Sequence, residues 1–307
     1  MKNLVIAVTV AILFSTTTVS IAQVKSYTHE TAPTQYVDVK GIKFAYRSFG
    51  KQGGIPIVFL QHFTGTMDNW DPAITNALAK NYHVILFNNK GVSTSGGKTP
   101  DAVADMAKDA VDFIKALGYN QVDLLGFSLG GFIAQDIAVN NPSLVRKIVL
   151  AGTGPIGSEG ITKLESVINE GYKDGPANAL VNLFFTKSEA SINAGKAFMA
   201  RLQQRTNDRD TPSTNETIGA QAKAIITFGY QKDDEHKQLL AIRQPVLIVN
   251  GTSDLIVPSI NSYVLSQYIP NSKLIIWSDA GHGGLFQYHE DFVREVEVFL
   301  GKQVKGK

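Results

Sequence analysis

The sequence predicts an α/β protein with a doubly wound, mostly parallel sheet, and two patterns carry this prediction. First, six short runs are almost continuously apolar, as is typical of strands that helices cover on both faces: Ile57–Leu60, Val84–Phe87, Val122–Leu125, Ile148–Leu150, Val246–Val249 and Leu274–Trp277. Second, segments with helical spacing lie between these runs. Alternation of this kind implies parallel strands joined by right-handed helical crossovers.

Two individual elements fit the same architecture. Residues 36–46 alternate apolar and polar side chains around Gly41, which predicts a hairpin at one edge of the sheet. The clearest helix is expected to begin at Thr99-Pro100-Asp101, because a capping threonine, a proline at the first helical position and an early acid are typical of a helix start. Gly118 ends this helix, and one face of it is apolar: Val103, Met106, Ala107, Ala110, Ile114 and Leu117.

The alternation of strands and helices stops between residues 157 and 244. This stretch has helical spacing but no convincing buried strand. We expect a helical insertion between two strands of the sheet, which divides the chain into a leader, a first core segment, the insertion and a second core segment: residues 1–22, 23–156, 157–244 and 245–307. The insertion is expected to form a lid, because ligands enter such sheets above the strand ends. A packing subdomain without a gating role is the alternative.

The first 22 residues resemble a secretory signal peptide. Lys2 precedes an apolar run, a Ser/Thr-rich stretch follows, and Ser20 and Ala22 place small residues at the two positions that a signal peptidase reads. The run is short for a membrane span, which favours cleavage after Ala22 over an uncleaved anchor. We therefore expect a periplasmic or secreted protein with no stable membrane span after cleavage, and the sequence does not distinguish these two locations.

The composition excludes several classes of function. A formal net charge of +2, without a basic stripe interleaved with aromatic residues, gives no pattern of nucleic-acid binding. The sequence has no cysteine, which excludes disulfides, a thiol nucleophile and thiolate metal sites. We expect no metal ion or organic cofactor, and the composition carries no indication of the oligomeric state. The 307 residues, 44% of them hydrophobic, are ample for a large core.

A candidate nucleophile lies where a predicted strand meets a predicted helix. The strand at 122–125 runs into Gly126-Phe127-Ser128-Leu129-Gly130, and a helical segment follows. A Gly-x-Ser-x-Gly pentapeptide at a strand-to-helix junction is the nucleophile-elbow pattern. The turn is so tight that side chains at Gly126 and Gly130 would collide with neighbouring backbone. The N–H groups at the start of the helix favour negative charge at the same place.

A serine nucleophile needs a base, and the base needs a carboxylate that orients it. This fold uses the chain order Ser, Asp, His. Asp254 follows the strand at 246–249 and His282 follows the last strand, so both side chains are expected at the carboxyl edge of the sheet, beside Ser128. Asp279 is a rival acid, but it is only three residues from His282 and would struggle to approach the far ring nitrogen. His29, His83, His236 and His289 are expected to be solvated or capping residues.

These motifs identify a family resemblance. In "GFSLGG", "NGTSDLIVP" and "AGHGG", the chain resembles serine-type α/β-hydrolases, especially bacterial proteins similar to cofactor-free haloperoxidases and small carboxylesterases. The resemblance runs from Tyr36 to about Leu300 and is weakest in the insertion. It implies the α/β-hydrolase fold, with Ser128, Asp254 and His282 as the catalytic triad.

The chain departs from the family pattern at two places. Relatives carry His-Gly before the residue whose N–H completes the oxyanion hole, whereas this chain has Gln61-His62-Phe63. Counting back from Trp70 places Phe63 at the family's oxyanion position, so the resemblance assigns the hole to the N–H groups of Phe63 and Leu129. His62 is then expected to brace the loop, and a substrate contact is the alternative. Relatives also have Asp-x-Arg-Gly where this chain has Asn88-Asn89-Lys90-Gly91, which is expected to weaken a structural ion pair.

The serine at the elbow narrows the expected chemistry. Haloalkane dehalogenases and epoxide hydrolases attack with aspartate, so a serine leaves acyl chemistry on a small-molecule substrate. Cleavage of a small ester, as in carboxylesterases, is the leading expectation. Carbon–carbon bond hydrolysis or perhydrolysis on the same triad remains an alternative, and so does a binding protein of this fold that has lost catalysis. The acyl group and the leaving group depend on how the insertion packs.

Overall fold

The computed structural model describes residues 26–301, apart from the side chains at positions 162, 176 and 177. The proposed signal peptide and its cleavage site lie outside the described residues. Within residues 26–301, no helix combines the length and the apolar character that a membrane crossing requires.

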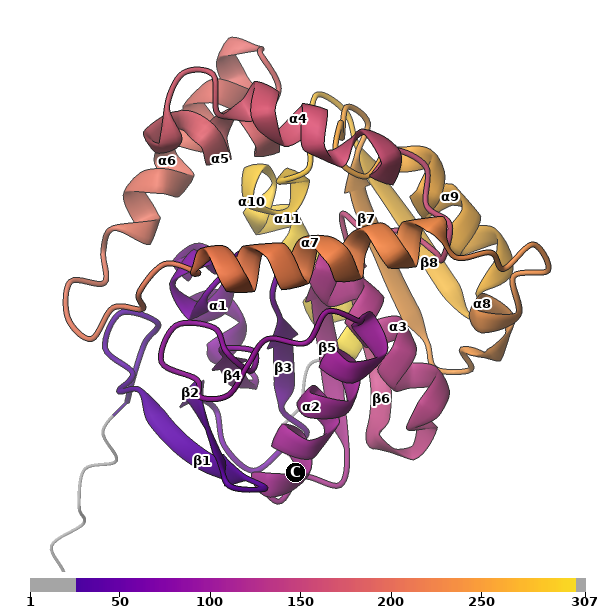
Figure 1. The fold of residues 1–307 in the computed structure, drawn as a ribbon. Helices are drawn as coiled ribbons and strands as arrows, with labels where there is room; N and C mark the ends of the chain where they lie inside the picture. The colour runs from indigo at the N-terminus through magenta and orange to yellow at the C-terminus, as the bar shows by residue number, and fades with distance from the viewer. Residues whose placement is uncertain (1–25, 302–307) are drawn as a thin grey trace, which may run out of the picture.

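An eight-stranded sheet forms the centre of the molecule (Figure 1). Its strands lie in the order β1-β2-β4-β3-β5-β6-β7-β8. β1 and β2 form an antiparallel hairpin, β2 pairs antiparallel with β4, and all later pairs are parallel. The bounds of the strands are β1 Gln35–Val39, β2 Ile42–Gly50, β3 Ile57–Leu60, β4 His83–Phe87, β5 Val122–Phe127, β6 Val145–Ala151, β7 Val246–Gly251 and β8 Ser272–Trp277. The predicted fold class, the edge hairpin and all six predicted parallel strands are therefore confirmed.

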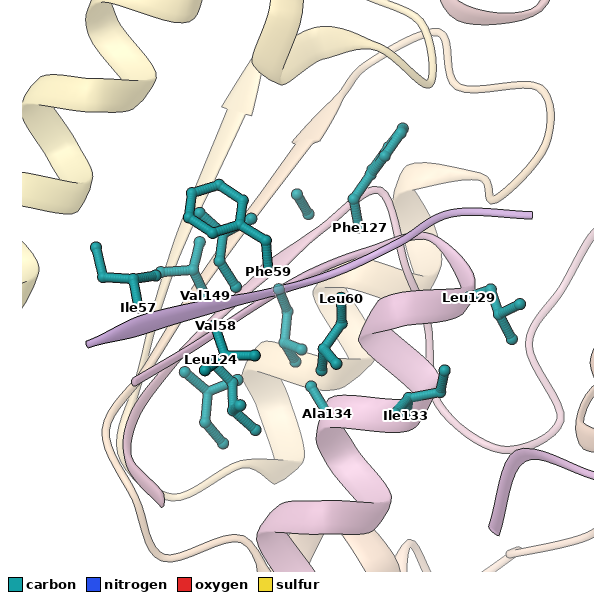
Figure 2. Close-up of a cluster of buried hydrophobic side chains, with 14 of the residues drawn as sticks. Ile57, Val58, Phe59, Leu60, Leu124, Phe127, Leu129, Ile133, Ala134 and Val149 are labelled. Atoms are coloured by element: carbon teal, nitrogen blue, oxygen red, sulfur yellow. The ribbon is translucent and has the colours of Figure 1, made fainter. Parts of the chain in front are cut away.

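Helices cover both faces of the sheet. In Figure 1, α2 and α3 lie in front of it, whereas α1 and α11 lie behind it. The helices outside the insertion are α1 Pro72–Ala79, α2 Val103–Ala116, α3 Leu129–Asn140, α9 Ser259–Tyr268, α10 Gly284–Gln287 and α11 His289–Leu300, with short 3₁₀ turns η1 Met67–Asn69 and η2 Pro142–Leu144. Figure 2 shows how the central strand is filled on both sides, because Phe59 and Leu60 point to opposite faces of β3 and Leu60 points to the side of Ala134 in α3. This two-sided covering explains why the central strands are apolar throughout.

The chain leaves the sheet after β6 and returns at β7, which is its neighbour in the sheet. The inserted segment, residues 157–244, contains helices and no strand: η3 Ile161–Lys163, α4 Leu164–Gly171, α5 Pro176–Phe184, α6 Glu189–Leu202, α7 Asn215–Tyr230 and α8 Lys237–Ala241. In the view of Figure 1, α7 crosses the molecule below α4, α5 and α6. α8 packs against α3 and α9. Whether the inserted segment acts as a lid stays a prediction.

Two local predictions were wrong. α2 begins at Val103 with Ala102 as its N-cap, four residues after Thr99. The Thr99 hydroxyl does not cap this helix, because it is buried against the Thr217 hydroxyl of α7 at 3.0 Å. β8 was expected to be buried on both faces, yet its residues are half-buried or exposed. It is the last strand of the sheet and has a neighbour on one side alone, so its surroundings cover it less completely.

Candidate active site

Ser128 occupies a strained turn between β5 and α3. Its backbone has φ 56° and ψ −119°, a conformation that a residue with a side chain adopts at an energetic cost. Hydrogen bonds from the turn and from β6 hold it: the Ser128 N–H donates to the Ala151 carbonyl at 2.9 Å, and the Gly131 N–H donates to the Ser128 carbonyl at 2.8 Å. The Thr153 hydroxyl donates to that same carbonyl at 2.9 Å.

The two glycines of the pentapeptide are required by close backbone packing. A Cβ atom on Gly130 would lie 2.0 Å from the Leu60 carbonyl oxygen, and one on Gly126 would lie 2.4 Å from the Gly130 carbonyl oxygen. Real Cβ atoms do not approach backbone atoms so closely. The collision predicted from the sequence for these two positions is confirmed, and the turn is packed against β3.

Asp254 and His282 form a buried hydrogen-bonded pair beyond β7 and β8. The distance from His282 Nδ1 to Asp254 Oδ2 is 2.8 Å, and both residues are buried. The other carboxylate oxygen accepts hydrogen bonds from the Ile256 and Val257 N–H groups, each at 2.9 Å. The carboxylate is therefore fixed by its own loop, and it fixes the imidazole in turn.

Asp279, the alternative candidate for the orienting acid, is bonded to the inserted segment. The carboxylate of Asp279 accepts hydrogen bonds from the hydroxyls of Thr186 and Ser188, each at 2.6 Å. The Ser188 and Thr186 hydroxyls lower the pKa of this carboxylate, because they stabilise its charged form. Asp279 therefore contacts the inserted segment, whereas Asp254 contacts the imidazole of His282.

Two of the other histidines are buried, which contradicts the expectation of solvated or capping roles. His29 Nδ1 lies 3.0 Å from the Thr75 hydroxyl, and burial lowers the pKa of His29 to about 4. His83 bridges Ser48 and the Tyr119 hydroxyl, with ring-nitrogen distances of 2.6 and 3.2 Å. Tertiary contacts decide the burial of both rings, so local sequence gave no signal of it.

Leu129 and Phe63, the residues assigned to the oxyanion hole, adjoin Ser128 in the chain and in the pocket, respectively. Leu129 is the first residue of α3, where N–H groups have no acceptor within the helix. Phe63 follows β3 in the oxyanion loop, residues 61–66, and its side chain lines the same pocket as Ser128 and His282. Gln61 in this loop is buried, and its side-chain amide donates to the Thr66 carbonyl.

His62 precedes Phe63 in the oxyanion loop, where the family resemblance leads one to expect glycine. Its Nδ1 lies 2.8 Å from the Phe63 carbonyl oxygen, which requires Nδ1 to carry the proton because a carbonyl can only accept. Burial lowers the pKa of His62 to about 4, although the hydrogen bond to the Phe63 carbonyl acts in the opposite direction. The ring also packs edge-on against Phe127 and Phe184, with both centroid distances at 5.4 Å. These contacts tie the ring to its own loop and to the aromatic side chains around it.

A small apolar pocket contains the candidate nucleophile and base. Its volume is about 70 Å³, far below the several hundred Å³ of a typical drug-sized site. Ser128, His282, His62, Phe63 and Thr64 line it together with Tyr172 and apolar residues of the core and the inserted segment: Phe132, Ile161, Leu164, Ile168, Leu180, Leu183, Phe184, Ile225, Ile256 and Val257. Phe132 lies one helical turn after Ser128, and Ile256 and Val257 directly follow Asp254, so sequence position gave a usable signal for these three residues.

Both Leu183 and Phe184 line this pocket. These two residues are adjacent in the chain, but α5 ends at Phe184, so their side chains are not confined to opposite faces of a helix. Phe184 also packs on His282, with ring centroids 5.5 Å apart. Its carbonyl accepts a hydrogen bond of 2.8 Å from the Gly283 N–H, next to His282.

A wider surface depression of about 1020 Å³ lies away from these residues. Charged side chains of both signs line it, and many of them pair with one another, including Lys40–Asp112 at 2.5 Å, Lys90–Asp109 at 3.5 Å and Lys223–Asp101 at 2.6 Å. This depression has no paired nucleophile and base. Within residues 26–301, no group of three or more His, Cys, Asp or Glu side chains is placed to hold a metal ion.

A buried charged cluster lies beside Asn88, where the sequence predicts a weakened ion pair. Asn88 donates to Asp210 of the inserted segment at 2.7 Å and accepts from the Met67 N–H at 2.9 Å. Arg47, which is fully buried, pairs with Asp68 and lies 3.5 Å from the second oxygen of Asp210. The charged side chains near Asn88 therefore come from three places: β2, the 3₁₀ turn η1 and the inserted segment.

Comparisons with known proteins fit this architecture. A model of the alpha/beta hydrolase fold family matches residues 55–287. The solved structure of an alpha/beta hydrolase fold protein from Chitinophaga pinensis is similar, with 43% sequence identity, a TM-score of 0.87 and coverage of 90% of this chain and 99% of that one.

Two named relatives are more distant in sequence. Serine hydrolase BPHL from Homo sapiens is 26% identical over 273 residues, which are 86% of this chain and 85% of the relative. A 2-hydroxy-6-oxononadienedioate/2-hydroxy-6-oxononatrienedioate hydrolase from Dechloromonas aromatica is 26% identical over 292 residues, with 88% and 96% covered. Together with the strand order and the family match, these similarities confirm the resemblance inferred from the motifs: the chain belongs to the alpha/beta hydrolase fold family.

Proposed function

We propose that this protein is a serine hydrolase that cleaves a small ester-type substrate through an acyl-enzyme intermediate. The observation that carries the proposal is the buried Asp254–His282 pair, whose imidazole lines the same small pocket as the strained Ser128. Asp254 accepts from Nδ1, so Nε2 of His282 is left to accept a proton.

In this proposal Ser128 Oγ attacks the substrate carbonyl while His282 Nε2 takes the hydroxyl proton. The C–O bond to the leaving alcohol then breaks, and His282 returns the proton to the alcohol. The N–H groups of Leu129 and Phe63 stabilise the oxyanion of the tetrahedral intermediate. Water, activated by the same imidazole, hydrolyses the acyl-enzyme. The buried Asp254 stabilises the imidazolium that forms in both steps.

The pocket supports a small, uncharged acyl group. It is small in volume, and among the described residues that line it there is no lysine or arginine. A carboxylate on the acyl group would therefore lack a cationic partner in the pocket, and burying it unpaired would be costly. With the leader interpreted as a signal peptide, the substrate would be met in the periplasm or outside the cell.

Carbon–carbon bond hydrolysis is the second candidate function. It is supported by the relative from Dechloromonas aromatica, whose name gives a dicarboxylate substrate. The same triad would serve this reaction. The uncharged lining of the pocket favours the ester, since the named substrate carries two carboxylates. Comparing turnover of p-nitrophenyl acetate with that of a vinylogous diketone acid separates the two candidates.

The decisive experiment replaces the nucleophile. Ser128→Ala is expected to lower kcat for p-nitrophenyl acetate by about 10⁴-fold or more and to abolish labelling by a fluorophosphonate, since triad residues act as a unit. Ser95→Ala is the matched control, because Ser95 is also buried but bonds the Asn88 carbonyl and the Ala45 N–H. Retained turnover in folded Ser128→Ala, or wild-type protein that neither turns over esters nor takes the label, would contradict the proposal.

A further inference from the structure

Thr64, next to the proposed oxyanion donor Phe63, has an unusual backbone conformation. Its φ is +63°, in the left-handed region that a β-branched residue rarely adopts. Such a residue costs on the order of 1 to 3 kcal/mol and persists where its surroundings hold it in place. The direction of the Phe63 N–H depends on this loop, so whatever holds Thr64 also sets the oxyanion hole.

Both backbone polar groups of Thr64 are bonded to side chains of the inserted segment. The Thr64 N–H donates to Gln221 Oε1 at 2.7 Å, and the Thr64 carbonyl accepts from the Ser213 hydroxyl at 2.9 Å. Gln221 is fully buried on α7, so no water competes for its oxygen. The partners stand 157 and 149 residues away along the chain.

The part of the inserted segment that carries these side chains is itself fastened to the core. The Thr217 hydroxyl donates to the Gly91 carbonyl at 2.9 Å, and Thr214 caps α7. Before α7, Asp210 accepts from Asn88, and Arg201 forms a two-point pair with Asp71 at 2.8 and 2.6 Å. These bonds fasten the segment around α7 to the core, so α7 can support the oxyanion loop.

We propose that Gln221, assisted by Ser213, is a positioning residue that holds the oxyanion loop in its active geometry. This proposal rests on the proposed serine-hydrolase function. An oxyanion donor must lie about 2.7–3.1 Å from the oxygen as charge develops, so a tilted loop weakens the transition state more than the bound substrate. Loss of Gln221 should therefore lower kcat while KM changes little.

The test combines two substitutions with a matched control. Gln221→Met keeps the length of the side chain and removes its oxygen, and kcat is expected to fall about 10- to 100-fold with KM within about twofold. Gln221→Glu keeps an acceptor oxygen in its protonated form, which burial favours, and should recover much of the loss. Gln244→Met is the control, because Gln244 is also buried but bonds the Ala138 and Pro142 carbonyls. It should leave kcat within about twofold even if the protein becomes less stable.

Two further measurements distinguish an effect on the oxyanion hole from a loss of folded protein. Ser213→Ala removes the second support at a partly exposed site and is expected to lower kcat several-fold. Affinity for a trifluoromethyl ketone, whose addition to Ser128 creates an oxyanion, should fall across the variants in proportion to kcat/KM. Ester turnover that survives Ser128→Ala overturns both proposals. Ser128-dependent turnover that neither Gln221→Met nor Ser213→Ala alters, or an effect confined to KM, overturns this proposal alone.

Discussion

The turn at Ser128 and the oxyanion loop at residues 61–66 both hold a non-glycine residue at positive φ, and they are supported differently. Ser128 is held mainly by backbone groups of the turn and of β6, and by glycines that let α3 pack against β3. Thr64 is held by side chains that arrive from the inserted segment. The proposed nucleophile is therefore held by the core of the fold, whereas the proposed oxyanion loop is held by side chains of the inserted segment.

The same contrast separates the two carboxylates near His282, and here we expect the largest effect. Asp254 is fixed by backbone N–H groups of its own loop, and Asp279 by hydroxyls of the inserted segment. Asp254→Asn should lower kcat by about 10⁴-fold, because the amide favours the wrong imidazole tautomer. Asp279→Asn should cost less than about tenfold. Steady-state kinetics on p-nitrophenyl acetate measures both, and the reverse ranking would show that Asp279 is the orienting acid.

Substitutions at two glycines test the packing side of the comparison. A Cβ on Gly130 would meet backbone of β3 at 2.0 Å, whereas one on Gly65 would meet the Gln61 and His62 side chains at 2.7 and 2.9 Å. The buried Gln61 and His62 side chains can shift more readily than the backbone of a central strand. Gly130→Ala should therefore destabilise the protein by about 3 kcal/mol or more, and Gly65→Ala by about 1 kcal/mol. Urea unfolding of both variants decides the matter, and equal losses would mean that the oxyanion loop is as rigid as the elbow.

Acid should act on the oxyanion loop through His62. Its pKa is lowered to about 4 in the folded protein, so the unfolded chain takes up a proton first as pH falls below about 6.5. Stability contributed by the neutral ring is therefore intact above that pH and is lost progressively towards pH 4, by on the order of 2 to 3 kcal/mol.

Unfolding free energies at pH 7 and pH 4.5 check this expectation. His62→Gln, which cannot titrate, should lose less stability between the two pH values than the wild type does. His29→Gln offers a comparison outside the site, since the pKa of His29 is also lowered to about 4 by burial. A pH dependence in His62→Gln equal to that of the wild type would mean that this ring does not titrate as described.

The sequence was sufficient for features that local pattern and strand order determine. The apolar runs predicted the parallel strands, and the elbow motif predicted both the turn at Ser128 and the glycines that it requires. Asp254 and His282 could be paired in advance because residues that follow neighbouring parallel strands meet at one edge. The choice between Asp254 and Asp279 followed from reach along the chain.

Features that depend on side-chain contacts between distant parts of the chain could not be predicted from the sequence. Nothing local marks Gln221 as the partner of Thr64, since the two residues are brought together by the path of α7. The late start of α2 has the same origin, because Thr99 bonds Thr217 instead of capping the helix. Burial of His29 likewise depends on contact with Thr75 of α1. The half-exposed β8 reflects its place at the end of the sheet, which apolar content alone does not reveal.

The aromatic rings around His282 are close enough to shift the NMR signals of its imidazole protons. Phe127 lies 4.9 Å from the imidazole centroid at an interplanar angle of 36°, and Phe184 lies 5.5 Å away at 62°. Circulating π electrons in these rings displace the resonance frequencies of nearby imidazole protons from those of a histidine in solvent. Because Phe184 belongs to the inserted segment, any rearrangement of that segment changes the field at the ring. The proton spectrum of the imidazole therefore reports on how the inserted segment packs around the pocket that contains Ser128.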